Sequence, residues 1–274
     1  MRVAAFLLVL LAALASDLAA AAAQTSLTVT GRARSTSFTR EQLLAHPSLR
    51  TVAVAHDPVF GRAMTYRAVP VAGLLRAVGT GADDYVQARA VDDFSVAIPA
   101  DLLLDAGEAF LAIEEPGRPW PLLQKAGKDY DAGPFYLVWA GRRGADVSSE
   151  YWAYRLAALT AVDSPARRWP QLGVGADLPA DDFVRRGLDR FVAVCLACHR
   201  FKGAGEANQG PDLGTPMNPV DYFRPNALRR LLRTPDQVRT WPERKMPAFT
   251  VEMLSDADLD AILAWLAYKA RQAR

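Results

Sequence analysis

Cysteine and histidine are scarce in this chain of 274 residues, which has two of the first and three of the second. A disulfide-stapled miniprotein and a metal site built from several thiolates are therefore excluded. The net charge is only +2, so the composition gives no reason to expect nucleic acid as a partner. The hydrophobic content of 51% is enough for one or two folded domains with real cores.

Residues 1–23 have the pattern of a secretory signal peptide. Arg2 precedes an apolar run over Val3–Ala15, and small residues end the segment at Ala21–Ala23. The run is shorter than the ~20 residues that span a bilayer. We therefore expect cleavage at the end of this segment, a periplasmic protein and no stable membrane insertion. The alternative is an uncleaved, membrane-anchored form, because Leu18–Ala23 extend the apolar stretch.

Residues 24–165 alternate short β-rich runs with short helical patterns and contain no internal repeat. A capping box at Thr39–Gln42 predicts a short helix that stops at His46-Pro47, and Pro70 begins a second helix that ends at Gly79. Eight runs rich in β-branched and aromatic residues are the predicted strands: Leu27–Thr30, Thr51–Ala55, Met64–Ala68, Tyr85–Ala90, Phe94–Ile98, Ala109–Glu114, Phe135–Trp139 and Tyr151–Val162.

The composition changes after this region. Residues 166–181 are rich in Pro, Gly and charge, which predicts a linker, and residues 182–274 have the patterns of a small all-α domain. Its first helix has an apolar face from Val184 to Cys195. Asn226 is the expected cap of a second helix that ends at Thr234-Pro235, and Ser255 precedes the third.

The segment Cys195-Leu196-Ala197-Cys198-His199 is a C-x-x-C-H motif, the attachment pattern of c-type haem. Two thiols three positions apart on a helical turn reach the two vinyl groups of one porphyrin, and His199 then supplies an axial bond to the iron. A thioredoxin-like pair, a zinc half-site and two buried cysteines are the alternatives. A thioredoxin motif belongs beside a βα unit and zinc needs four ligands, so one haem c is the expected cofactor.

Four motifs occur here in the order found in class I cytochromes c, and residues 182–274 resemble that family. The motifs are Gly187-x-x-x-Phe191-x-x-x-Cys195, Gly210-Pro211-Asp212-Leu213, Met246-Pro247 and Ala264-Trp265-Leu266. The resemblance implies that the Pro211 carbonyl accepts the Nδ1–H of His199. It also implies that Trp265 packs over Gly187 and that Met246 lies in the loop of the second axial ligand.

Met246 is the expected second iron ligand because a loop thioether suits haem iron. Met217 follows His199 by only 18 positions and is the main alternative. An open sixth site and a bis-histidine haem that uses His46 or His56 are two others. The remaining methionines are expected to pack in the protein or to leave with the signal peptide: Met1, Met64 and Met253.

Basic residues gather in the segment before Met246: Arg224, Arg229, Arg230, Arg233, Arg239, Arg244 and Lys245. A positive rim beside the haem predicts redox partners with acidic docking surfaces and a salt-dependent association rate. The alternative is a solvated, arginine-rich helix. Trp241 is the candidate indole donor to a haem propionate.

Five segments of the N-terminal region occur in the order found in the molybdopterin-binding domain of the sulfite oxidase type: Leu27–Gly31, Phe38–Leu44, Thr65–Leu75, Asp92–Pro99 and Gly133–Val138. Residues 24–165 resemble a shortened version of that domain, which implies an α+β domain with a mixed sheet. In that family a cysteine thiolate binds molybdenum, and this chain has no cysteine between Gln24 and Val194. Molybdopterin is therefore not the expected cofactor, and we expect a docking or small-ligand module. A cofactor held by pterin contacts alone is the alternative.

Together these patterns favour a periplasmic electron carrier with one haem ligated by His199 and Met246, rather than an enzyme in its own right. One alternative is the haem-containing, electron-accepting part of an oxidoreductase whose N-terminal domain binds a substrate or molybdopterin. Another is a non-catalytic, haem-containing interaction or redox-sensor protein.

Overall fold

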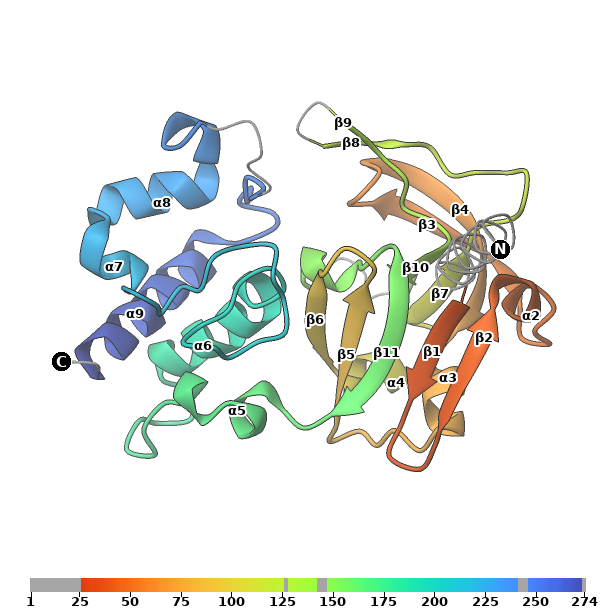
Figure 1. Cartoon of the computed structure of the whole chain (residues 1–274), viewed down its shortest axis with the longest axis horizontal. Coiled ribbons are helices and arrows are strands. Elements are labelled where there is room, and N and C mark those ends of the chain that lie inside the picture. The colour runs from red at the N-terminus through yellow and green to blue at the C-terminus, as the bar shows by residue number, and fades with distance from the viewer. Residues whose placement is uncertain (1–25, 126–127, 142–146, 241–245, 273–274) are drawn as a thin grey trace, which may run out of the picture.

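The computed structural model describes residues 26–125, 128–141, 147–240 and 246–272. Strands dominate residues 26–162, called the strand-rich region below, and helices dominate residues 165–272, called the helical region. The two regions lie side by side (Figure 1). The predicted fold class is thus confirmed, because a mixed α/β region precedes a helical one. The predicted signal peptide, residues 1–23, lies outside the described residues.

The first sheet of the strand-rich region has five strands in the order β2-β1-β11-β5-β6. They are β1 (Ser26–Thr30), β2 (Ser35–Thr39), β5 (Tyr85–Ala90), β6 (Ser95–Pro99) and β11 (Leu156–Val162). The pair β1 and β11 is parallel and the other pairs are antiparallel, so the sheet is mixed. Strand β6 is at the edge of the sheet that faces the helical region (Figure 1).

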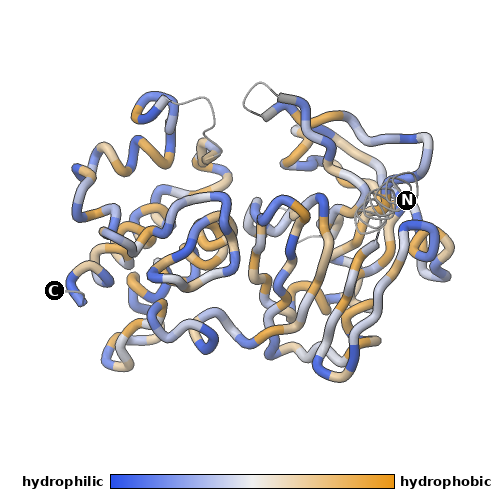
Figure 2. The backbone as a smooth tube through the Cα atoms, viewed as in Figure 1, coloured by the Kyte–Doolittle hydropathy of each residue, from blue (hydrophilic) through white to orange (hydrophobic). Residues whose placement is uncertain are grey.

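The second sheet is antiparallel, with the order β10-β7-β4-β3. Its strands are β3 (Arg50–Asp57), β4 (Arg62–Pro70), β7 (Ala109–Ile113) and β10 (Phe135–Trp139), and a small hairpin joins β8 (Leu123–Lys125) to β9 (Lys128–Tyr130). Every residue of β7 and β10 is buried, which explains their continuous apolar sequences. Hydrophobic residues recur along the strands and along the last helix (Figure 2).

One predicted strand boundary needs correction, and strands β2, β8 and β9 were not predicted. The last strand begins at Leu156 rather than at Tyr151, because Ser149–Tyr151 form a 3-10 helix, η2, capped by the Ser148 side chain. Strand β2 was not predicted, because its sequence STSFT is polar and mostly exposed. Pairing with β1 orders it, and Thr28 Oγ1 lies 2.9 Å from Ser37 Oγ across the pair.

Short helices cover the sheets of this region. Helix α2 (Arg40–Leu44) has the predicted capping box, in which the Thr39 side chain accepts the Gln42 N–H at 3.2 Å and Gln42 Oε1 accepts the Thr39 N–H at 2.8 Å. Helix α3 (Val71–Ala77) also follows the prediction, whereas α4 (Ala100–Leu104) was not foreseen.

The stretch expected to be a linker forms the start of the helical region and packs against its last helix. It contains α5 (Pro165–Arg168) and the 3-10 helix η3 (Pro170–Leu172). Leu172 is fully buried, and its carbonyl oxygen accepts the Trp265 Nε1–H at 3.3 Å.

The helical region contains α6 (Phe183–Arg190), which continues as the π-helix η4 (Phe191–Cys195), then α7 (Pro219–Tyr222), α8 (Pro225–Arg233), the 3-10 helix η5 (Pro235–Gln237) and α9 (Asp256–Gln272). The expectation that Asn226 caps α8 is wrong. Arg224 is the N-cap residue and Pro225 takes the first helical position, where its fixed φ favours the helix. Within the described ranges, no helix combines the length and apolar character needed to cross a bilayer.

Helix α6 packs closely on α9. A Cβ atom on Gly187 would lie only 2.0 Å from the Ala261 carbonyl oxygen and 2.8 Å from the Trp265 Cβ, so the two helices approach at a position that only glycine fits. Trp265 is fully buried, with its ring centre 4.3 Å from that of Phe191 and 4.8 Å from that of Phe201. This aromatic cluster fixes α9 against the end of η4.

Hydrogen bonds join the two regions around the C-x-x-C-H motif. The Ser95 N–H on β6 donates to the Ala197 carbonyl at 3.2 Å, and Ser148 Oγ donates to the Ala193 carbonyl at 3.3 Å. Gln209 Nε2 donates to the Asp92 carbonyl at 3.1 Å. The edge strand of the first sheet is thus covered by the segment that carries the motif.

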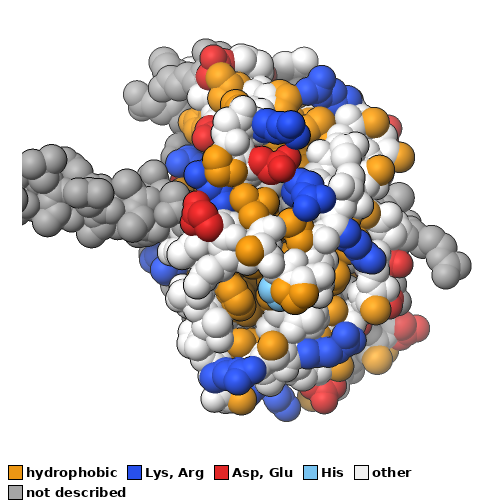
Figure 3. All heavy atoms as spheres, turned by 90° about the vertical axis from the view of Figure 1, so that its right-hand side faces the viewer, with side chains coloured by type: hydrophobic (Ala, Val, Ile, Leu, Met, Phe, Trp, Pro, Cys, Tyr) orange, Lys and Arg blue, Asp and Glu red, His pale blue; other side chains and the backbone are white. Residues whose placement is uncertain are grey.

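The outer end of the strand-rich region faces the viewer in Figure 3. Lys, Arg, Asp and Glu side chains are interspersed there with apolar ones. This face therefore gives no electrostatic reason to expect a partner of one charge sign.

Candidate haem-binding site

A cavity of about 250 Å³ lies in the helical region, between η4, α8, α9 and the loops that connect them. Most of its lining is aliphatic or aromatic, and α8, α9 and η4 contribute Val194, Leu228, Leu231, Leu232, Ile262 and Leu266. Such a lining suits a large apolar group that is held in place by a small number of polar contacts.

Cys195, Cys198 and His199 all line this cavity. The His199 N–H donates to the Cys195 carbonyl at 2.9 Å, so one helical turn carries both thiols and the imidazole to the same wall. This turn follows the π-helix η4, in which the Leu196 N–H donates to the Phe191 carbonyl at 2.9 Å. Single-turn π-helices that continue an α-helix, as η4 does here, are frequent at functional sites.

The two thiols are partly buried and unbonded to each other. Burial, with smaller contributions from Cys198 and Glu150, raises the pKa of the Cys195 thiol to about 12. Cys198 Sγ lies 3.6 Å from Gln209 Oε1. The Cys195 sulfur is therefore held as a neutral thiol at the cavity wall.

His199 is oriented by its neighbours on the following loop. Its Nδ1 lies 2.8 Å from the Pro211 carbonyl oxygen, which leaves Nε2 as the ring nitrogen available to a metal. A Cβ atom on Gly210 would lie 2.4 Å from the ring, so the absence of a side chain there makes room for the imidazole. Burial lowers the pKa of His199 although the Pro211 carbonyl opposes this shift, which favours the neutral imidazole that binds metals.

The loop that carries Pro211 is fixed by the Asp212 carboxylate, which accepts the backbone N–H groups of Lys202, Gly203 and Gly214 at 2.7–2.8 Å. Burial alone would raise the pKa of Asp212, but these donors outweigh it and lower the pKa. The charged carboxylate thus holds the Pro211 carbonyl in place beside His199.

Met246 is partly buried and lines the same cavity, next to Pro247. Met217 is 52% exposed and Met253 37% exposed, and neither lines the cavity. Met64 lies on β4 in the other region. The structure therefore brings Met246, rather than another described methionine, into the cavity that the two thiols and His199 share.

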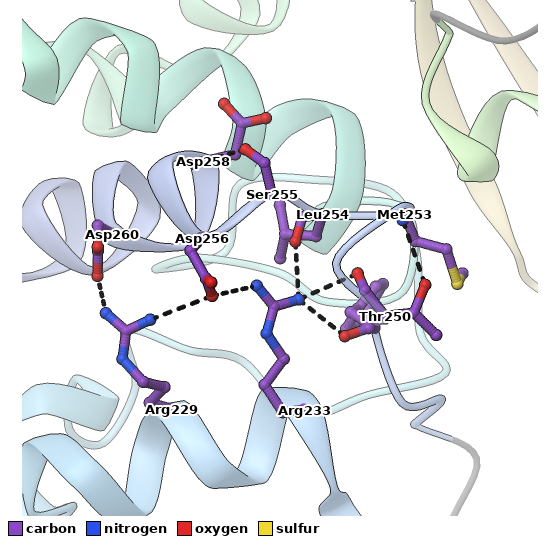
Figure 4. A network of polar contacts seen from close by, with 10 residues as sticks. Arg229, Arg233, Thr250, Met253, Leu254, Ser255, Asp256, Asp258 and Asp260 are labelled. Atoms are coloured by element: carbon purple, nitrogen blue, oxygen red, sulfur yellow. Dashed lines mark hydrogen bonds and ion pairs between the residues drawn. The ribbon is translucent and has the colours of Figure 1, made fainter.

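A polar network holds the segment that follows Met246 against α8 (Figure 4). Arg233 Nη1 donates to the carbonyl oxygens of Phe249, Thr250 and Leu254 at 2.7–3.0 Å. Arg233 Nη2 also pairs with Asp256 at 2.7 Å. The partly buried Arg233 guanidinium thereby ties the segment after Met246 to both α8 and the start of α9.

The basic residues before Met246 are not all available to a partner. Arg229 pairs with Asp256 and Asp260, and Arg233 pairs with Asp256 (Figure 4). Arg239 lines the cavity, with its guanidinium carbon 4.7 Å from the ring centre of Phe223. Trp241, Arg244 and Lys245 lie outside the described residues.

His46 and His56 lie in the strand-rich region and do not line the cavity. His46 follows α2, and its Nδ1 accepts the Ser48 N–H at 3.2 Å. His56 is on β3. In the part of the chain that the structure describes, no group of three or more His, Cys, Asp and Glu side chains could hold a metal ion.

Glu150 and Gln209 line the cavity but were not predicted as site residues. Glu150 belongs to η2 in the strand-rich region, 45 positions before Cys195. Gln209 immediately precedes the Gly210-Pro211 motif. Neither residue stands out by type or spacing in the sequence, because packing of distant segments brings them to the cavity.

The donor set fits a covalently attached haem. Two thiols on one helical turn, an imidazole oriented through Nδ1 and a thioether on a separate loop all line one apolar cavity. This is the combination expected for a haem c with His and Met axial ligands.

A comparison with known protein families supports the haem assignment for the helical region. Residues 184–269 match the family model of cytochrome c, so this region is a cytochrome c domain, which implies covalently bound haem. No curated protein matches the chain.

One solved structure similar to the chain is the sulfane dehydrogenase SoxCD from Paracoccus pantotrophus, at 17% identity and a TM-score of 0.35. The match covers 52% of this chain and 39% of that chain, so this protein spans less than half of its length. A similarity of this size does not show a common fold.

Proposed function

We propose that the protein is a periplasmic electron carrier that holds one haem c. Cys195 and Cys198 attach the porphyrin, and His199 and Met246 are the axial ligands. The observation that carries this proposal is that all four side chains line one apolar cavity in a cytochrome c domain. Haem supplies a one-electron redox centre when bound, with a potential set by its axial ligands, its burial and nearby charge.

The roles of the surrounding residues follow from their contacts. Pro211 accepts the His199 Nδ1–H and so holds the imidazole plane and its tautomer. The aliphatic walls contributed by α8 and α9 exclude water and favour the thioether over a water ligand. Arg239 places a positive charge at the cavity and is the described candidate for pairing with a propionate. Trp241, which the sequence analysis names, is a second candidate for a hydrogen bond to a propionate.

The ligand assignment is tested by optical spectra of the oxidised, haem-loaded protein. Met246→Ala removes the proposed thioether, so we expect loss of the low-spin His/Met spectrum and a lower reduction potential. Met217→Ala is the matched control, because Met217 is exposed and outside the cavity, and its spectrum should equal that of the wild type. The reverse result would assign the ligand to Met217, and two unchanged spectra would exclude both.

We further propose that redox partners dock on the helical region through acidic surfaces. The exposed side chains of Arg224 and Arg230 support this proposal, whereas Arg229 and Arg233 already pair with aspartates. The partner-binding rate constant should fall as the salt concentration rises, and a rate constant independent of salt would contradict the proposal.

For the strand-rich region we propose a shortened domain of the sulfite oxidase molybdopterin type that serves as a docking or small-ligand module. The order of its sequence segments supports this, and the lack of any cysteine between Gln24 and Val194 argues against a molybdenum thiolate. Metal analysis of the purified full chain distinguishes the proposal from the alternative, an oxidoreductase with its own pterin site. We expect one iron per chain and no molybdenum, and stoichiometric molybdenum would favour the alternative.

A further inference from the structure

Among the described residues that line the cytochrome cavity, one comes from outside the cytochrome domain. Glu150 lies on η2 of the strand-rich region, yet it lines the cavity together with Cys195 and Val194. It is partly buried, and it is the acidic side chain among the described lining residues. Burying a carboxylate in a mostly apolar lining costs free energy unless polar or charged neighbours compensate it.

The position of Glu150 is fixed by hydrogen bonds between the two regions. The Ser148 side chain accepts the Glu150 N–H at 3.4 Å and caps η2. The same Ser148 Oγ donates to the Ala193 carbonyl at 3.3 Å, within the π-helix that leads into the haem motif. Glu150 therefore sits two residues from an anchor point on η4 rather than on a free loop.

Two further hydrogen bonds hold the regions together beside this point. Ser95 N–H donates to the Ala197 carbonyl inside the C-x-x-C-H motif, and Gln209 Nε2 donates to the Asp92 carbonyl. Gln209 itself lines the cavity. The strand-rich region is thus packed against the attachment turn at two further points, besides the one at Ser148 that holds η2.

The charge of Glu150 acts on the attachment turn. Its carboxylate contributes to the raised pKa of the Cys195 thiol, after burial and Cys198. A negative charge that disfavours a second negative charge on Cys195 favours a positive one at the same place. Oxidised haem iron carries one more positive charge than reduced iron, so the same carboxylate stabilises the oxidised state.

We propose that the strand-rich region completes the haem site by placing the Glu150 carboxylate at its wall, where it lowers the reduction potential of the bound haem. This inference rests on the proposed haem function. It gives the strand-rich region a defined electrostatic role in the redox centre, independent of any ligand of its own.

The test uses full-length, haem-loaded protein, with midpoint potentials measured by spectroelectrochemistry. Glu150→Gln removes the charge at nearly constant size, and Glu150→Lys reverses it. Glu115→Gln is the matched control, because Glu115 is also a partly buried glutamate of the strand-rich region but does not line the cavity. Optical spectra are recorded first, so that only protein with unchanged axial ligands is compared.

We expect the potential to rise in Glu150→Gln, to rise further in Glu150→Lys and to stay at the wild-type value in Glu115→Gln. The order of the three potentials follows charge, which a purely structural effect of the substitutions would not produce. Equal potentials in wild type and both Glu150 variants would overturn the inference while leaving the haem function intact. A wild-type protein without haem would instead refute the proposed function itself. If a variant loads less haem, its potential is read from the loaded fraction and decides the question in the same way.

Discussion

Gly187→Ala tests the close packing of α6 on α9, on which the cytochrome cavity depends. The added Cβ would lie 2.0 Å from the Ala261 carbonyl oxygen, whereas carbon and other heavy atoms in contact are normally ~3.5–4.0 Å apart. The obstacle is backbone, so no rotamer change relieves it and the helices must separate. Overpacking of this kind costs about 1–3 kcal/mol, which the better helix propensity of alanine offsets by ~0.5–1 kcal/mol.

The expected net loss of stability is up to ~2.5 kcal/mol, which lowers the Tm by up to roughly 10 °C for a protein of this size. Gly73→Ala is the control, since Gly73 is an exposed helical glycine with open space around its Cβ position. That variant should be unchanged or more stable by ~0.5–1 kcal/mol. Thermal unfolding followed by far-UV circular dichroism measures both. If Gly187→Ala unfolds at the same temperature as Gly73→Ala, the inferred helix contact is wrong.

Two other substitutions test the site and its support. Gly210→Ala would place a Cβ 2.4 Å from the His199 ring, so we expect a displaced imidazole and an altered haem spectrum at unchanged haem content. A wild-type spectrum would show that the His199 ring does not pack against Gly210. Asp258→Asn removes a buried carboxylate that pairs with Arg186 at 2.8 Å and Arg190 at 3.1 Å, and we expect a loss of ~1–2 kcal/mol at pH 7. Burial alone would raise the pKa of Asp258, but these partners lower it below the ordinary value of 3.8. The ionised carboxylate therefore stabilises the folded protein above pH 3.8. This contribution is lost as the pH falls through the folded-state pKa. Urea unfolding of wild type and Asp258→Asn should therefore converge in acid, and a difference that persists at low pH would contradict the ion-pair account.

Local signals in the sequence were sufficient for much of the fold. The capping box at Thr39 and Gln42 depends on side chains three positions apart, and it is present as predicted. The apolar runs of β7 and β10 are recognisable because burial on both faces requires them. Strand β2 was not predicted, because pairing with β1 stabilises its extended conformation and its own polar sequence does not indicate a strand.

The errors near helix ends have a similar cause. Asn226 is a good capping residue, but Pro225 before it fits the first helical position and shifts the start of α8 to the N-terminal side. Tyr151 has strand propensity, yet it lies in η2, where the Ser148 cap and packing against η4 decide its conformation. Tertiary contacts outweigh propensity at both positions.

The residues of the candidate site are also of two kinds, those marked by a local sequence pattern and those brought together by packing. The spacing of Cys195, Cys198 and His199 is local, so the motif could be recognised without a structure. The entry of Glu150 into the same cavity depends on the packing of η2 against η4, and no local pattern marks it. A single sequence therefore reveals the residues of the C-x-x-C-H motif more easily than a residue that only packing brings to the cavity.

Covalent attachment of one haem through Cys195 and Cys198 is the central claim, and intact mass spectrometry of the denatured protein tests it most directly. The full chain is produced in a host that matures c-type cytochromes and is compared with a Cys195→Ala, Cys198→Ala double variant. We predict that the wild-type mass exceeds that of the mature polypeptide by one haem, and that the double variant carries none after denaturation. A wild-type mass equal to that of the polypeptide alone, or haem retained by the double variant, would contradict the claim.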